Sequence, residues 1–162
     1  WLRDQLSEID LPPLDEAALQ ELLPALCHGR RSFAELRHAP WLAALRGLFR
    51  FEQLQTVDRE APERLTVPSG RSVPLRYEPG QPPVLAVRIQ ELFGWSETPR
   101  IARGRVPVLL HLLAPNMRPQ QVTDDLRSFW NNGYPVVRKE LRRRYPRHAW
   151  PEEPWSAKAE RK

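Results

Sequence analysis

The feature that most constrains this chain is its proline content. Eighteen of the 162 residues are proline, against seven glycines. A proline lacks a backbone N–H and fixes φ, so it interrupts helix interiors and central strands. The sequence therefore predicts many short helices and strands joined by stiff turns. Apolar residues make up 41% of the chain. That share supports a hydrophobic core, and the length suits one compact domain or two small ones.

Several classes of protein are excluded by simple counts. No apolar run approaches the 18 residues of a membrane-spanning helix, so we expect no membrane partner. The single cysteine, Cys27, excludes an internal disulfide framework and a cysteine zinc site, and it fits a reduced, cytoplasmic compartment. The chain opens at Trp1 without an initiator Met and without a signal-peptide pattern. We therefore expect a piece of a longer cytoplasmic protein.

The formal net charge of +5 hides an asymmetry. Up to Glu63 there are 7 basic and 11 acidic residues, a net charge of −4. From Arg64 onward there are 18 basic and 9 acidic residues, a net charge of +9. A basic half that also carries aromatic residues suggests an anionic partner, and nucleic acid is the usual one. The alternative is that the asymmetry only reflects a solvated surface.

The first 62 residues carry helical patterns. Apolar residues recur at helical spacing over 14–26, 33–36, 41–48 and 51–57. Pro24 is expected to kink or split the first of these helices. Ser32 and Glu35 have the spacing of a capping box, and Pro40 suits the first position of a helix. This section is therefore predicted to be helical.

The periodicity changes near Arg64. Segments 65–68 and 72–77 flank a glycine turn at 69–71, which is the pattern of a β-hairpin. Residues 84–89 could continue the sheet, although 88–93 fits better as a short helix closed by Gly94. The apolar run 106–113 predicts a buried strand. Together these segments indicate a small antiparallel sheet.

The last long element is an apolar stripe with steps of three or four residues from Val122 to Tyr145. The stripe passes through Gly133-Tyr134-Pro135, so we expect one kinked helix, capped by Thr123 with two aspartates at its positive end. The predicted fold class is α+β: a helical N-terminal section (1–62), a small antiparallel sheet and a long kinked C-terminal helix (63–154), and a flexible tail (155–162). The predicted core is Trp41, Phe93, Leu109, Leu110, Leu112, Leu126, Phe129, Trp130, Val137 and Leu141.

We find no pattern typical of a catalytic or metal site. Glycines never cluster and no Gly-Lys-Ser or Gly-Lys-Thr occurs, so no phosphate-binding loop is present. The four histidines lack metal-ligand spacing. Cys27 and His28 are adjacent and would point apart on a helix, and helix capping explains Asp124-Asp125 better than a metal does. We expect no enzyme activity, cofactor or metal in this chain.

The remaining constellation is the basic segment 138–151, which holds five arginines, one lysine and two aromatic residues. Arginine pairs with phosphate, and aromatic rings stack on unpaired bases of single-stranded RNA. The candidate phosphate-binding residues are Arg138, Lys139, Arg142, Arg143 and Arg147, and the candidate stacking residues are Tyr145 and Trp150. Two alternatives stay open. The segment could dock on another part of the same protein, or it could be a solvated face with cations favoured at a helix C-terminus.

Several segments of the second half, taken together and in this order, form a recognisable family pattern. They are Leu65-Thr66-Val67-Pro68-Ser69-Gly70, Pro83 through Gly94, Thr98-Pro99-Arg100-Ile101-Ala102, Gly104-Arg105-Val106-Pro107, Arg118 through Thr123, Ser128-Phe129-Trp130, and Val137 through Pro146. They resemble the C-terminal region of the HrpB-type ATP-dependent RNA helicases of bacteria, in the DEAH group. The resemblance covers about 61–154, with weaker similarity back to 32–36.

The resemblance implies a parent protein that unwinds or remodels RNA with ATP and Mg²⁺ bound in motor domains upstream. None of the family's motor motifs is present here, so no catalytic residue is carried over. The expected function is an accessory region that contacts single-stranded RNA non-specifically. The alternative is a docking module for the upstream helicase domains or a protein partner. The family assigns this region no residue-level activity, and the sequence leaves the oligomeric state open.

Overall fold

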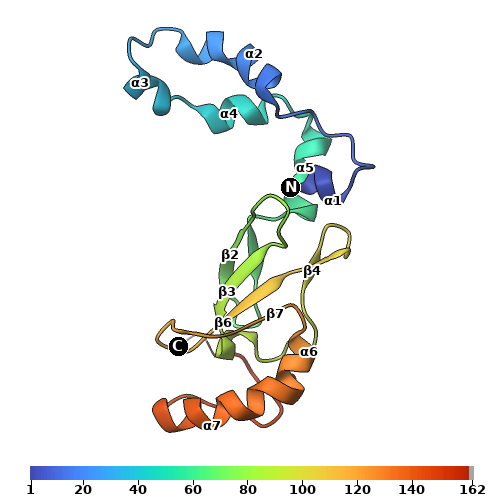
Figure 1. The fold of residues 1–162 in the computed structure, drawn as a ribbon, viewed down its shortest axis with the longest axis vertical. Coiled ribbons are helices and arrows are strands. Elements are labelled where there is room, and N and C mark those ends of the chain that lie inside the picture. The colour runs from blue at the N-terminus through green and yellow to red at the C-terminus, as the bar shows by residue number, and fades with distance from the viewer. Residues whose placement is uncertain (161–162) are drawn as a thin grey trace.

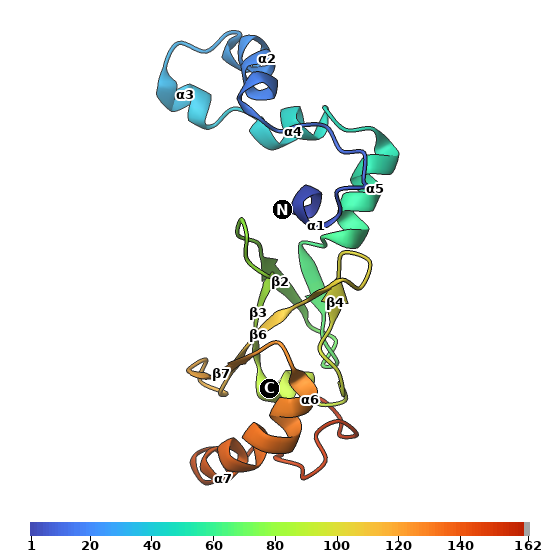
Figure 2. The same cartoon turned by 45° about the vertical axis from the view of Figure 1, so that its right-hand side comes forward.

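The computed structural model describes residues 1–160. Five helices come first: α1 (Leu2–Gln5), α2 (Glu16–Cys27), α3 (Phe33–Arg37), α4 (Trp41–Arg46) and α5 (Phe51–Glu60). Helices α2–α4 form an arm at one end of an elongated molecule, the sheet occupies the middle, and α7 lies at the other end (Figure 1). The turned view in Figure 2 shows the same order. The predicted helical N-terminal section is thus present.

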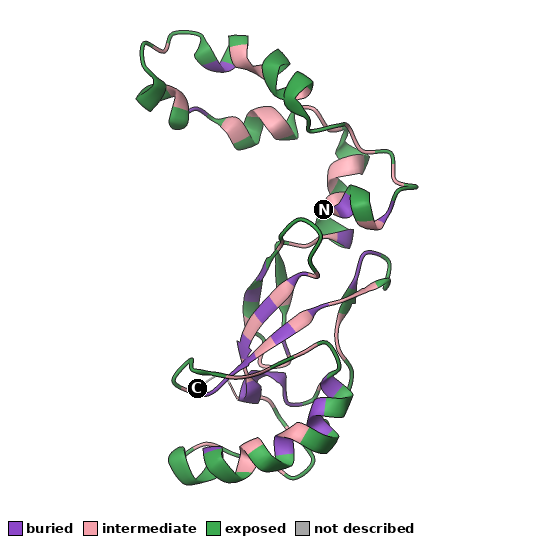
Figure 3. Ribbon diagram, viewed as in Figure 1, coloured by how far each residue is buried: buried purple, intermediate pink, exposed green. Residues whose placement is uncertain are grey.

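The arm, residues 11–50, is helical for local reasons and has little core. Asp15 caps α2 by accepting the Ala18 N–H, and Ser32 caps α3 by accepting the Glu35 N–H. Pro24, expected to kink or split this helix, lies inside α2, which continues to Cys27 without being split. Only Leu26 and Ala39 are buried in this arm. Figure 3 accordingly shows the buried residues concentrated in the sheet and the C-terminal helix.

The sheet is built from β1 (Arg64–Thr66), β2 (Ser72–Arg76), β3 (Val84–Arg88), β6 (Leu109–Leu113) and β7 (Pro119–Thr123), in the order β1-β2-β3-β6-β7. The predicted hairpin is β1–β2, with Leu65 opposite Val73. The sheet is mixed and not wholly antiparallel, because β3 and β6 pair in parallel. The 3₁₀ helix η1 (Ile89–Leu92) follows β3 directly, so both interpretations of 84–93 hold in part.

The apolar run 106–113 is two strands and not one. β5 (Val106–Pro107) pairs with β4 (Arg100–Ile101) in a separate two-stranded sheet. The Val108 N–H still donates to the Pro99 carbonyl, which continues the β4–β5 pairing by one residue. Only the second part, β6, enters the main sheet. The run therefore changes sheets at Leu109, whose N–H donates to the Pro83 carbonyl beside β3.

The start of the C-terminal helix also differs from the prediction. Thr123 ends strand β7, and Asp125 is the N-cap, accepting the Ser128 N–H at 2.8 Å. The helix then runs through α6 (Leu126–Ser128), a π-helical segment η2 (Phe129–Gly133) and α7 (Tyr134–Arg144). The α+β class with a kinked C-terminal helix is confirmed.

The main core lies between the sheet, η1 and the C-terminal helix. Seven of the ten predicted core residues are buried: Phe93, Leu110, Leu112, Leu126, Phe129, Trp130 and Leu141. Trp41, Leu109 and Val137 are only half-buried. Trp41 belongs to the arm, which has too little neighbouring structure to cover it. Leu109 and Val137 point partly toward solvent.

The tail 155–160, expected to be flexible, lies against the domain, whereas the last two residues of that predicted tail are outside the described residues. The Glu160 N–H donates to the Gln90 carbonyl at 3.1 Å. Ala157 and Ala159 pack against the main core. The C-terminal segment therefore adds a layer over η1.

Candidate nucleic-acid interface

The kink of the C-terminal helix has two local causes. Pro135 supplies no N–H to the helix, and the Tyr134 N–H bonds to the Phe129 carbonyl five residues earlier, the π-helical pattern. Gly133 is required for space, since a Cβ there would lie 2.7 Å from Gln121 Oε1 and 2.8 Å from Phe129 Cδ2. The kink lets the aromatic part pack on the sheet while α7 projects beyond it.

The C-terminal half of α7 and the turn after it present a cluster of cations, called here the basic face: Lys139, Arg142, Arg143 and Arg147. All four side chains are exposed. Within residues 1–160, none of the four forms an ion pair or a side-chain hydrogen bond. Neighbouring Arg144 is also exposed and lies over the Tyr145 ring, 5.9 Å from its centroid. The basic face therefore has charge available for an anion.

The other three predicted residues make contacts within the domain: Arg138, Tyr145 and Trp150. Residues 145–155 fold back along α7, and Arg138 holds them there. Its Nε donates to the Trp150 carbonyl at 2.8 Å, and its Nη2 lies 3.1 Å from Glu152 Oε1. Trp150 is buried, and its indole N–H donates to the Tyr145 carbonyl. Tyr145 is half-buried against the core.

This setting revises the predicted site. A base cannot stack on a buried Trp150 ring in this arrangement, and the Arg138 guanidinium is already engaged. Tyr134 reinforces the same fold-back, because its hydroxyl donates to the Pro151 carbonyl and burial raises its pKa well above the ordinary tyrosine value. The structure thus brings together four of the seven predicted residues as an accessible cluster and withdraws Arg138 and Trp150, with Tyr145 partly covered.

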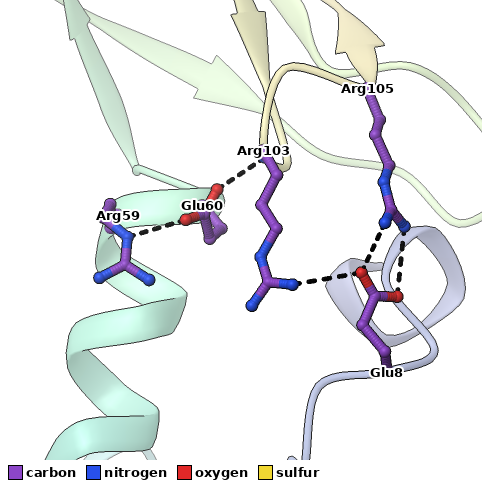
Figure 4. Close-up of polar contacts among 5 residues, drawn as sticks. All are labelled: Glu8, Arg59, Glu60, Arg103 and Arg105. Carbon is purple, nitrogen blue, oxygen red and sulfur yellow. Dashed lines mark hydrogen bonds and ion pairs between the residues drawn. The ribbon is translucent and has the colours of Figure 1, made fainter.

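A second group of arginines, Arg59, Arg103 and Arg105, binds carboxylates of this chain (Figure 4). Glu8 forms ion pairs with Arg103 at 3.3 Å and with Arg105 at 2.7 Å. Its own backbone hydrogen bond, followed by the hydrogen bond from Arg105, lowers the pKa of the Glu8 carboxyl. These contacts tie the segment after α1 to the turn between β4 and β5.

Glu60, at the end of α5, fixes the same turn. Its carboxylate accepts an Arg59 Nε–H at 2.8 Å and the Arg103 backbone N–H at 2.7 Å, and these bonds, the Arg59 one first, lower the pKa of the Glu60 carboxyl. Its carbonyl accepts the Ala102 N–H. Ala102 and Arg103 have φ of 52° and 55°, a region unfavourable for non-glycine residues. The carboxylate therefore holds a strained turn and joins the helical section to the β-region. Sequence reasoning did not identify this pairing because its partners lie more than 40 residues apart.

Neither metal nor membrane features appear in the part of the chain that the structure describes. No three His, Cys, Asp or Glu side chains gather as a metal site there. No helix among these residues has the length and hydropathy needed to cross a bilayer. Asp125 acts as a helix cap, as the capping interpretation of Asp124-Asp125 predicted.

The kinked helix on a mixed sheet, preceded by a helical arm, is the architecture of a known class. Residues 22–154 match the family described as "ATP-dependent helicase C-terminal". The chain belongs to this family of HrpB-type helicase C-terminal regions, as the resemblance indicated. The ATP-dependent RNA helicase HrpB of Escherichia coli (strain K12) is 44% identical over 153 residues, which cover 92% of this chain and 19% of that protein.

Solved structures agree with this assignment. A crystal structure of the E. coli DExH-box NTPase HrpB has a TM-score of 0.89 and 40% identity, covering 97% of this chain and 20% of that one. A crystal structure of the E. coli DEAH/RHA helicase HrpB has a TM-score of 0.72 and 41% identity, covering 91% and 19% respectively. The chain therefore spans about a fifth of the length of these relatives.

Proposed function

We propose that this chain is the C-terminal accessory region of an ATP-dependent RNA helicase and that it contacts single-stranded RNA through the basic face. The observation that carries this proposal is the accessibility of Lys139, Arg142, Arg143 and Arg147, which have no acidic partner within residues 1–160. Such contacts would be made to phosphates, so binding would be independent of RNA sequence. ATP and Mg²⁺ would be bound by the motor domains of the parent protein, in the cytoplasm.

Two further observations support an anionic partner. The similar E. coli protein is named as an RNA helicase, and the half of this chain that carries the basic face has a net charge of +9. Non-specific binding of this kind is weak, with dissociation constants of about 10⁻⁴–10⁻⁶ M at physiological salt. The region would therefore keep RNA near the motor and would not select a particular RNA.

The test is a titration of a short fluorescent single-stranded RNA with the 162-residue chain, followed by fluorescence anisotropy. The variant Arg142→Ala with Arg143→Ala removes half of the basic face. The control variant, Arg31→Ala with Arg37→Ala, removes the same charge from exposed positions on the arm. The proposal expects weaker binding only for the first variant. If both double variants weaken RNA binding equally, the effect depends only on net charge and the basic face is not a specific contact.

A second candidate function, docking on the rest of the helicase polypeptide, is favoured by the arm and its junction with α5. Five large apolar side chains there are exposed: Leu14, Leu19, Phe33, Leu42 and Phe51. Large exposed apolar side chains on a segment with so little core of its own favour an interaction surface. The relatives are about five times longer than this chain, so the rest of their polypeptide is the natural partner. If the arm docks on the rest of the polypeptide, the double variant Phe33→Ser with Leu42→Ser should lower the melting temperature of the parent protein. The same substitutions in the 162-residue chain should leave its RNA binding unchanged.

A further inference from the structure

A small cavity lies beside the kinked helix, away from the basic face. Its volume is about 300 Å³, and its lining residues are Ser96, Arg127, Trp130, Asn131 and Trp155. They come from the loop after η1, from α6, from η2 and from the C-terminal tail. A cavity of this size is at the lower limit of small-ligand pockets, about 300–1,000 Å³. It suits one planar group such as a nucleobase.

The backbone that carries the aromatic wall of this cavity is anchored on both sides. Trp155 is 40% exposed, and the turn that carries it is anchored where the Gly94 N–H donates to the Pro154 carbonyl at 2.8 Å. On the other side, the buried Trp130 donates its indole N–H to the Trp95 carbonyl. A base entering the cavity would therefore meet a ring carried by an anchored backbone, which lowers the cost of ordering the stacked pair.

The polar wall offers groups that suit a nucleotide. Ser96 and Asn131 are exposed, and within residues 1–160 neither side chain forms a hydrogen bond. An amide and a hydroxyl can each donate and accept, so they can satisfy the edges of different bases. Arg127 supplies a cation to the lining, and its ion pair among the described residues is with exposed Glu97 at 3.2 Å. Exposed ion pairs of this kind are weak, so a phosphate can compete for the guanidinium.

We propose that this cavity binds one unstacked base of single-stranded RNA, stacked on Trp155, with the adjacent phosphate on Arg127. This inference rests on the proposed RNA contact of the basic face and adds a site to it. Arg127 and Arg142 lie fifteen residues apart on one kinked helix, at most about 22 Å at the α-helical rise of 1.5 Å per residue. A single RNA strand of a few nucleotides can therefore reach both.

The test compares two ligands of equal charge: a short single-stranded oligouridine and an abasic ribose-phosphate strand of the same length. Wild-type chain is expected to prefer the base-containing strand by about 5- to 150-fold, the range of one base–aromatic stack. Trp155→Leu keeps apolar volume without an aromatic face and should abolish the preference, whereas Trp155→Phe should retain most of it. Met117→Ala, at an apolar position of 47% exposure in the turn between β6 and β7, removes a comparably exposed apolar side chain and should change nothing.

The outcomes separate the two proposals. If neither strand binds at about 50 mM salt, both the RNA contact and the base pocket fail. If both strands bind equally, the basic face stands and the pocket is overturned. If Trp155→Leu keeps the preference for the base-containing strand, Trp155 does not stack on a base and the base pocket is likewise overturned. A preference that disappears in Trp155→Leu and survives Arg142→Ala with Arg143→Ala establishes the pocket.

Discussion

The salt dependence of RNA binding gives the most quantitative test of the basic face. For single-stranded nucleic acid, the logarithm of the binding constant falls with the logarithm of salt concentration, with a slope of about −0.7 for each phosphate neutralised. The basic face offers four cations that have no ion-pair partner among residues 1–160: Lys139, Arg142, Arg143 and Arg147. If all four meet phosphates, the slope is about −2.8.

That slope fixes the size of the effect. Between about 50 and 200 mM salt, affinity should fall about 50-fold for the wild-type chain. Arg142→Ala with Arg143→Ala leaves two contacts, so its slope should be about −1.4 and its affinity should fall about 7-fold over the same interval. The variant and the wild type should therefore converge at high salt.

Fluorescence anisotropy at four or more salt concentrations would measure both slopes. The control, Arg31→Ala with Arg37→Ala, lowers net charge equally and should keep the wild-type slope. A wild-type slope near zero would refute a phosphate contact of any kind. An unchanged slope in the Arg142 and Arg143 variant, with a reduced slope in the control, would move the RNA contact from α7 to the arm.

Three further predictions concern the fold that positions the basic face. Trp130→Ala should lower the free energy of unfolding by about 3–5 kcal/mol in urea denaturation, because the side chain is 2% exposed and packs on other aromatic rings. Gly133→Ala should cost about 1–3 kcal/mol in the same assay, since the new Cβ would overlap Phe129 and Gln121. The pKa of Glu60 is lowered in the folded state, so its ionised carboxylate stabilises the fold at pH values above the ordinary carboxyl pKa. This stabilisation is lost as the pH falls through the lowered, folded-state pKa. Glu60→Gln should therefore have a lower melting temperature at pH 7 and a smaller loss between pH 5 and 3 than the wild type.

Local sequence patterns predicted the elements whose causes are local. The change of period near Arg64, the glycine turn and the stripe through Gly133-Tyr134-Pro135 correspond to β1–β2 and to the kinked helix. The parallel pairing of β3 with β6 could not be predicted in this way. It joins segments more than 20 residues apart, and no local pattern distinguishes a parallel from an antiparallel neighbour when both strands are buried.

The candidate site shows a different limit. A basic segment with two aromatic residues predicted base stacking, but spacing could not show which aromatic ring faces solvent. Trp150 is covered because Arg138 binds its carbonyl and its indole reaches the Tyr145 carbonyl. Trp155, placed in a predicted flexible tail, is the exposed ring, because the buried Pro154 beside it anchors the turn. These orientations depend on long-range packing that the chain's linear pattern does not contain.

The two proposed functions need not exclude each other, because they use opposite ends of the molecule. The arm carries exposed apolar side chains and almost no core of its own, whereas the basic face lies at the far end on α7 (Figures 1 and 2). Glu60 and Glu8 join the helical section to the β-region through one strained turn. Docking through the arm would then fix where α7 points, and an RNA strand held there would lie at a set distance from the motor. Weakening the turn by Glu60→Gln should consequently impair RNA stimulation of the parent's ATPase more than it impairs RNA binding by the isolated chain.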